Sequence, residues 1–364
     1  MRRLAPVAGV AAVVGALALM LLLVVPLGEP EQQAGEVTGP RDRARPAPEV
    51  DPAARSAMER ATQALATWSY EGTQIVAAQD GKEVSQVVEV THTPAAGTSV
   101  RSSTGGPAVT ASLHGADPSL VGGGAVALLT RYYSLRMGTA DRVAGRETDV
   151  VEAVRPGADG RVVARFWLDR ESGVVLRREV YDAAGRAVRV SAFTDVRLTK
   201  APSDTATTGS ADGRAWSSTL DATALARMKR HGWWDCPDAL PGPLPLVDAR
   251  RGGKGGSVVH LSYADGISSI SVFQMRGSLD ESDVRDYRRI EVAGDPVWVR
   301  DAVPRKAVWA SGETVYVVLG DAPRRTVDRA VVLLHAGASK GEKGTVDRLG
   351  RGLDRVASWF NPFE

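Results

Sequence analysis

The chain has 364 residues, of which 43% are hydrophobic and 24% charged, so two domains with cores of their own are expected. Its formal net charge of +2 disfavours nucleic acid as the main partner, because phosphate binding needs a concentrated basic surface. The single cysteine excludes an intramolecular disulfide and a cysteine-based metal cluster.

The chain begins with an apolar segment. Arg2 and Arg3 precede an uncharged run from Leu4 to Leu27, which as a helix at about 1.5 Å per residue exceeds a hydrocarbon core of about 30 Å. Its expected membrane-facing residues include Leu4, Leu17, Leu22 and Leu27. Because no small-residue cleavage pattern follows, residues 1–28 favour a retained anchor, with a cleaved signal as the alternative. In both cases the positive-inside rule places the rest of the chain outside the cytoplasm.

Residues 29–50 are rich in Pro, Gly, Glu and Arg and predict a flexible tether. A first domain is predicted over residues 51–199. Asp51 and Pro52 are typical of a helix start. Apolar residues at steps of three and four then predict an amphipathic helix that packs on another element. These residues are Ala54, Met58, Ala61, Leu65 and Trp68.

Strand patterns and regularly spaced turns follow this helix. They predict antiparallel strands over 70–78, 82–93, 147–154, 161–168, 174–181 and 186–198, with a short helix near 125–129. Val174, Leu176 and Val180 alternate with charged residues, which predicts one buried face. The expected α+β fold is an antiparallel half-barrel with the helix on its concave face, leaving an apolar cavity or groove. Candidate ligand-binding residues of that cavity, with plain core as the alternative, are Met58, Leu65, Trp68, Tyr70 and Trp167.

A polar linker is predicted at residues 200–213, and a small α+β second domain at residues 214–336. Strand patterns at 258–263, 267–274, 296–301, 307–310 and 314–319 lie between expected helices at 220–229 and 326–334. Residues 337–364 are predicted to form a basic hinge and an amphipathic tail helix. That helix would lie on an anionic membrane or dock on the protein itself.

No motif for catalysis, a metal or a cofactor is found. The five histidines have no metal-ligand spacing, and there is no G-x-S-x-G elbow. The glycine-rich stretches at 122–124 and 251–257 do not match a phosphate loop. We therefore expect a protein that is not an enzyme and carries no cofactor.

Several sequence fragments in both predicted domains form a recognisable order. In the first domain these are residues 67–73, 142–146, 166–169, 172–173, 176–177 and 193–195, and in the second 240–242, 260–267 and 271–273. Taken in this order, the fragments resemble the MucB/RseB family of regulators of envelope-stress sigma factors. The resemblance covers roughly Ala54 to Ala336. It implies a first domain like the lipoprotein carriers LolA and LolB, followed by a smaller C-terminal domain.

The resemblance also implies a function. Such a protein binds the extracytoplasmic part of a transmembrane anti-sigma factor, shields it from proteolysis and is released by lipid or lipoprotein binding. The alternative is a lipid or lipoprotein carrier of the cell envelope, which a permanent anchor disfavours. A cell-wall hydrolase is a third hypothesis, and it requires a convergent acidic pair that the sequence does not indicate.

Overall fold

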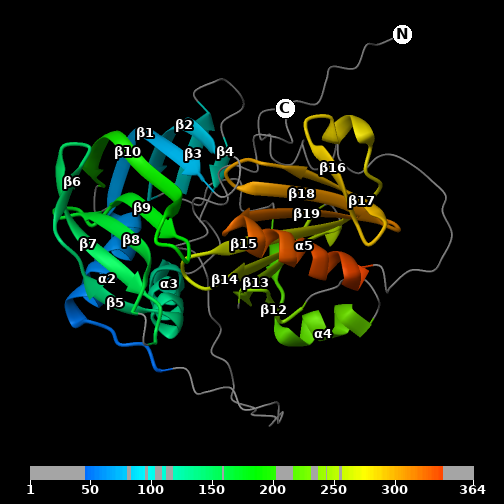
Figure 1. Ribbon diagram of the computed structural model, residues 1–364, viewed down its shortest axis with the longest axis horizontal. Coiled ribbons are helices and arrows are strands. Elements are labelled where there is room, and N and C mark those ends of the chain that lie inside the picture. Colours follow the sequence, from blue (N-terminus) through cyan, green and yellow to red (C-terminus); the bar gives the residue numbers. More distant parts are fainter. Residues whose placement is uncertain are drawn as a thin grey trace.

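The computed structural model describes residues 46–79, 83–94, 97–102, 109–111, 118–157, 160–201, 216–230, 237–242, 244–253 and 256–338. These residues form two antiparallel sheets that lie side by side, each with helices on one face (Figure 1). Both sheets are open, and the predicted α+β class is confirmed.

Helix α2 (Pro52–Thr67) begins where the sequence predicts. The Asp51 carboxylate accepts a hydrogen bond from the Ala53 backbone N–H at 2.8 Å, and Pro52 occupies a first-turn position that needs no N–H donor. The helix ends where Trp68 turns to extended backbone and opens the first strand.

The first sheet has the strand order β4-β3-β2-β1-β10-β9-β8-β7-β5, with β6 paired to β7. Its strands are β1 (Trp68–Ala78), β2 (Val84–Thr93), β3 (Gly97–Ser102), β4 (Val109–Ala111), β5 (Ser134–Met137), β6 (Asp141–Val143), β7 (Arg146–Val154), β8 (Val162–Asp169), β9 (Val175–Tyr181) and β10 (Ala187–Lys200). The first and last long strands, β1 and β10, pair along their length, so the sheet joins the two ends of this half of the chain.

A β-bulge between Thr73 and Gln74 bends the β1–β10 pair. Gly72 lies beside it, and a Cβ atom there would come within 2.2 Å of the Asp195 carbonyl oxygen. Only glycine allows the two backbones this approach.

Helices α2 and α3 (Pro118–Tyr132) lie against the same face of the first sheet, which curves around them (Figure 1). Val126 and Leu129 of α3 join the buried apolar cluster that α2 forms with Phe166 and Leu168 of β8. The predicted strands at 147–154, 161–168, 174–181 and 186–198 correspond to β7 to β10 within a residue or two at most ends.

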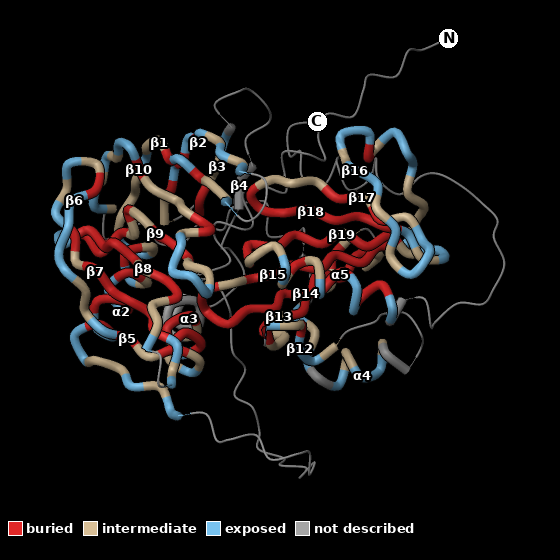
Figure 2. Tube along the Cα trace, viewed as in Figure 1, coloured by how far each residue is buried: buried red, intermediate tan, exposed pale blue. Residues whose placement is uncertain are grey.

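The second sheet has the order β11-β13-β14-β15-β19-β18-β17-β16, with β12 paired to β13. Its strands are β11 (Trp216–Thr219), β12 (Ala239–Leu240), β13 (Leu244–Gly252), β14 (Val258–Ala264), β15 (Ser269–Arg276), β16 (Arg288–Val292), β17 (Asp295–Arg300), β18 (Arg305–Ser311) and β19 (Thr314–Asp321). β14 is buried at every position, so it is covered on both faces (Figure 2).

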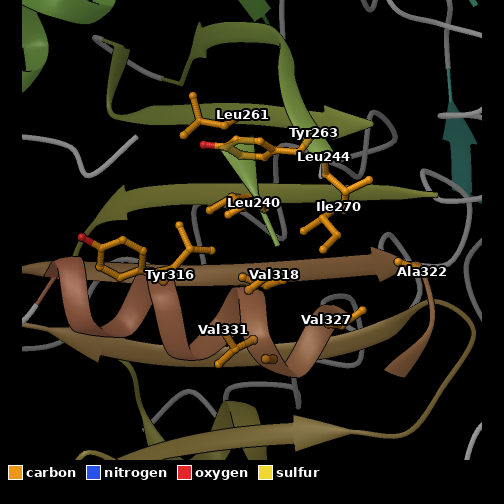
Figure 3. Close-up of a cluster of buried hydrophobic side chains, with 14 of the residues drawn as sticks. Leu240, Leu244, Leu261, Tyr263, Ile270, Tyr316, Val318, Ala322, Val327 and Val331 are labelled. Carbon is orange, nitrogen blue, oxygen red and sulfur yellow. The ribbon is translucent and has the colours of Figure 1, made fainter. Parts of the chain in front are cut away.

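Helices α4 (Ala222–Arg230) and α5 (Arg324–Ala338) cover one face of this sheet. Val327 and Val331 of α5 point onto the strands beside Val318 and Ile270 (Figure 3). The other face is covered at one end by the segment before β16, which includes the short helix η3 (Glu281–Val284).

His260 lies on that second face of β14. Its ring stacks on Phe273 of β15 at 4.3 Å between centroids and an interplanar angle of 2°. Burial, followed by the charge of Arg250, lowers the pKa of His260 to about 3, so the ring is neutral at physiological pH. The residue is part of the fold.

The predicted anchor at residues 1–28, most of the tether, the linker at 202–213 and the tail at 339–364 lie outside the described residues. Among the helices that the structure does describe, none combines the length and apolar character needed to cross a membrane.

Candidate functional site

The predicted cavity face of the first sheet is closely packed beneath α2. The helix turns a row of small side chains toward the strands: Ala54, Ala57, Ala61 and Ala64, with Met58 the only large one among them. Small residues let a helix approach a sheet closely, so Met58 fills the remaining space and is only 4% exposed. This half of the predicted hollow is core.

The other end of the same face is less tightly covered. Leu65, Trp68 and Tyr70 are each only partly buried where α2 ends and β1 begins. Other partly buried apolar residues of the same cluster come from β2, β3 and β10: Val84, Val100, Val196 and Leu198. We call Leu65, Trp68, Tyr70 and these four residues the apolar wall.

His92 anchors the apolar wall to α2. Its Nε2 donates to the Leu65 carbonyl oxygen at 2.9 Å, and its Nδ1 accepts from the Thr98 hydroxyl at 2.6 Å, because a carbonyl can only accept. Tyr70 stacks on the ring at 4.7 Å. Burial lowers the pKa of His92 and outweighs the opposing effect of the Leu65 hydrogen bond, so the imidazole stays neutral. Burial also raises the pKa of Tyr70 to about 12.

Trp167 is brought together with two of the other candidate residues. It is 5% exposed in the apolar cluster against which Trp68 and Tyr70 pack, whereas Met58 belongs to the neighbouring cluster of α2 and α3. The Trp167 Nε1 donates to the Asp141 carboxylate at 3.0 Å, and the Arg177 guanidinium lies 4.7 Å from the ring centre. Both contacts hold the indole ring in place.

Three of the family-like fragments meet around Asp169. Arg146 donates to both carboxylate oxygens of Asp169, at 2.6 and 3.1 Å, and Ser172 donates through its backbone N–H and its hydroxyl. Burial alone would raise the pKa of Asp169, but these hydrogen bonds outweigh it and lower the pKa. The fragments therefore fix the β6–β7 and β8–β9 turns against each other, which is a structural role.

A contact between the two sheets was missed by the sequence analysis. The turn between β14 and β15 places Ile267 in the same apolar cluster as Met58 and Leu129. Beside it, Arg178 and Arg189 of the first sheet are hydrogen bonded or paired to acceptors of the second. Arg178 had a signal, since it shares the alternation of Leu176 and Val180 and so falls on the predicted buried face.

Among the described residues, no group of three His, Cys, Asp or Glu side chains is arranged to hold a metal ion. His92 and Asp169, two polar residues of this site, form hydrogen bonds within the protein. What the site offers is partly exposed apolar surface and a contact between two sheets.

Several solved structures are similar to the chain. The MucA/MucB complex of Pseudomonas aeruginosa shares 20% identity over 77% of this chain and 97% of that chain, with a TM-score of 0.37. A crystal structure of MucB shares 19% identity over 78% and 98% of the two chains, with a TM-score of 0.39. A LolA superfamily protein of Nitrosomonas europaea shares 9% over 74% and 91%, with a TM-score of 0.18. No curated protein sequence matches the chain.

The family resemblance is supported by the sequence comparison, because the three structural similarities above have TM-scores below 0.5. Residues 117–211 match the family model described as the MucB/RseB N-terminal domain. The matched segment runs from α3 to the end of β10 and contains the Arg146–Asp169 pair, Trp167 and the buried Arg178 and Arg189. Over these residues the resemblance to the MucB/RseB family, inferred from ordered sequence fragments, is confirmed.

Proposed function

We propose that this protein is an extracytoplasmic negative regulator of an envelope-stress sigma factor pathway. It binds the extracytoplasmic part of a transmembrane anti-sigma factor and shields it from proteolysis, so that the sigma factor stays sequestered. The observation that carries the proposal is the match of residues 117–211 to the MucB/RseB N-terminal domain. The activity is binding, with no catalytic step.

The proposed location is outside the cytoplasm and at the membrane. The apolar run from Leu4 to Leu27 would anchor the chain, with Arg2 and Arg3 on the cytoplasmic side. Residues 29–50 would then give the folded part the reach to meet a partner whose own membrane segment ends nearby. If this chain and its partner are both anchored in the same membrane, they meet by diffusion in two dimensions, which favours their binding even when few copies of each are present.

The proposed release signal is a lipid or lipoprotein fragment bound on the face that carries the apolar wall. Leu65, Trp68 and Tyr70 present partly exposed apolar surface to such a ligand, and Met58 lies deeper under α2. Trp167 would support the site from within the buried cluster against which Trp68 and Tyr70 pack. A ligand shifts the protein only by preferring one arrangement of its parts over another.

The regulator proposal is tested by reconstituting the full chain with the single-span anti-sigma factor of its own genome in lipid nanodiscs. The expected results are capture of that factor and slower cleavage of its extracytoplasmic part by the site-1 protease. A chain that neither captures the factor nor slows its cleavage would contradict the proposal. The control is an unrelated single-span protein, which the chain should leave unbound.

A lipid or lipoprotein carrier is the second candidate function, favoured by the partly exposed residues of the apolar wall. It predicts lipid that copurifies with the chain and passes to acceptor vesicles. The substitution Leu65→Asp, which places a charge on the apolar wall, distinguishes the two proposals. A carrier loses transfer with this substitution, whereas the proposed regulator keeps its binding to the anti-sigma factor and loses only the response to lipid.

A further inference from the structure

The contact between the two sheets is built around buried charge. Arg178, Arg189 and Asp321 are 7%, 5% and 5% exposed. Asp321 accepts from Arg178 Nη1 at 2.9 Å, and its other oxygen lies 3.2 Å from Arg189 Nη1. The two arginines come from adjacent strands β9 and β10 of the first sheet, and Asp321 ends β19 of the second.

The side chains of the same two arginines also donate hydrogen bonds to backbone carbonyl groups in two turns of the second sheet. Arg178 Nη2 donates to the Ile267 carbonyl oxygen in the β14–β15 turn. Arg189 donates through Nε to the Ala322 carbonyl oxygen at 3.0 Å, in the turn before α5. Two guanidinium groups thus meet one carboxylate and two carbonyl groups, all supplied by the other sheet.

The apolar part of this contact is small. Ile267 enters the cluster of α2, α3 and the first sheet, and Leu128 of α3 packs against Val247 and Ala264 of the second sheet. Val303, between β17 and β18, joins the other apolar cluster of the first sheet. Tyr133 adds a hydrogen bond from its hydroxyl to the Asp265 carboxylate at 2.6 Å. A few apolar side chains contribute far less than the separate core that each sheet has.

We infer that Arg178, Arg189 and Asp321 form a latch that holds the β14–β15 turn against the first sheet, and that Ile267 couples this latch to the apolar cluster under α2. Buried ion pairs gain little net stability, because desolvation of the charges offsets their attraction. They do impose one geometry, since any partner left alone in a dry contact is strongly disfavoured. The two sheets are therefore either fully closed or separated and hydrated at this contact.

Ile267 provides the coupling because its side chain lies in the apolar part of the contact and its backbone carbonyl lies in the charged part. Its side chain is 2% exposed in the cluster with Met58, and its carbonyl oxygen is an acceptor for Arg178. Any apolar group that takes the place of the Ile267 side chain must move the turn, and the moving turn takes an acceptor from Arg178. This inference does not depend on the identity of the partner proposed above.

The test is hydrogen–deuterium exchange of the full chain in lipid nanodiscs, comparing wild type with Asp321→Asn. The substitution keeps the shape of the side chain but removes the one carboxylate that is paired with both guanidinium groups. The expected result is exchange faster by about 100-fold in the peptides covering 264–268 and 126–133, with β8 and β14 still protected. Unchanged exchange in both peptides overturns the latch.

Two further variants make the outcome decisive. Asp182→Asn removes a partly exposed carboxylate that is paired with Arg186 on the β9–β10 turn, and it should leave the same peptides unchanged. If β8 and β14 also lose their protection in Asp321→Asn, that variant has unfolded more than the contact, and Arg189→Gln becomes the test. Its side-chain amide can still donate to the Ala322 carbonyl oxygen, but it carries no charge to pair with Asp321. Local acceleration at 264–268 in Arg189→Gln then supports the latch, and none overturns it.

Discussion

Asp169 shows how a single residue of the family-like sequence stabilises the fold. It is 1% exposed and receives hydrogen bonds from Arg146 and Ser172. Asp169→Asn should lower the free energy of unfolding by about 2 kcal/mol, since it removes a charge that its partners depend on. Urea denaturation measures this. Glu171→Gln, which removes an exposed carboxylate from the same arginine, is the control and should change nothing measurable.

The Asp169 contribution should also depend on pH. Its folded-state pKa is lowered, so the stabilisation is present above the ordinary value near 4 and is lost as the pH falls through the folded-state pKa. Equal acid sensitivity of wild type and Asp169→Asn below pH 4 would contradict this assignment.

His92 and His260 predict a second pH effect with a different range. Burial lowers the pKa of both in the folded state, so below about pH 6.5 the unfolded chain binds protons that the folded chain does not. Stability is therefore complete above about pH 6.5 and falls as the pH drops. His92→Gln keeps a donor for Leu65 and should reduce this fall by about 1–2 kcal/mol between pH 7 and 5. Denaturant midpoints at the two pH values measure it; parallel profiles would contradict it.

Residue chemistry was only partly predictable from the sequence. Each of His92, Asp169 and Arg178 has at least one partner that lies 23 or more positions away in the chain. Spacing along the chain indicates such partners only when they share one element. The Arg178 position on a buried face was a signal that a charged partner had to exist.

At the scale of elements, α2 was predicted with its correct start, but its apolar stripe was placed slightly off and extended to Trp68, which opens β1. The expected stripe included Leu65, whereas the structure buries Ala57 and Ala64 and leaves Leu65 partly exposed. Hydrophobicity favours leucine over alanine, while close contact between a helix and a sheet favours the small residue. The sequence pattern could not decide between these two effects.

The alanine face predicts how the helix responds to added volume. Ala61→Leu places three more carbon atoms where α2 contacts the sheet, and overpacking should cost about 1–3 kcal/mol of unfolding free energy. Ala66→Leu adds the same atoms on the exposed side of the same helix and should be close to neutral. The difference between their urea midpoints isolates packing from helix propensity. Equal midpoints would mean that the space beneath α2 is open.

Strand prediction succeeded where hydrophobic alternation was regular and failed for β13. That strand contains Pro245 and three charged residues, and no strand was predicted over it. Two of those charges neutralise each other, because Arg250 Nε donates to Asp248 at 2.7 Å. Pairing with β12 and β14, which lie on either side, supplies the remaining order. Neither effect is visible from alternation.

At the scale of the whole molecule, the α+β class could be predicted from the sequence, but the contact between the sheets could not. The linker composition indicated two parts that fold separately, and it contains no information on how they meet. The turn at Asp265 and Gly266 was recognised only as a hairpin, yet the structure uses it to reach α3. Short turns serve equally well at a surface and at an interface.

Gly266 allows this contact to be tested against its own backbone strain. It has a φ of +91°, and a Cβ atom there would lie 2.7 Å from Leu129 Cα of α3. Gly294, in the β16–β17 turn, has a φ of +93° with nothing within 4 Å of such a Cβ. Alanine at either position therefore costs about 1 kcal/mol of stability through its positive φ. Only Gly266→Ala also forces α3 and the second sheet apart.

Gly266→Ala should accordingly accelerate hydrogen exchange in residues 126–133 of α3, while Gly294→Ala should leave α3 unchanged and affect only its own turn. Because the two variants share the strain of a positive φ, the difference between them reports the contact between the sheets alone. Equal protection of α3 in both would show that the sheets separate freely in solution. Faster exchange confined to Gly266→Ala would show that the two sheets are held together through the glycine turn.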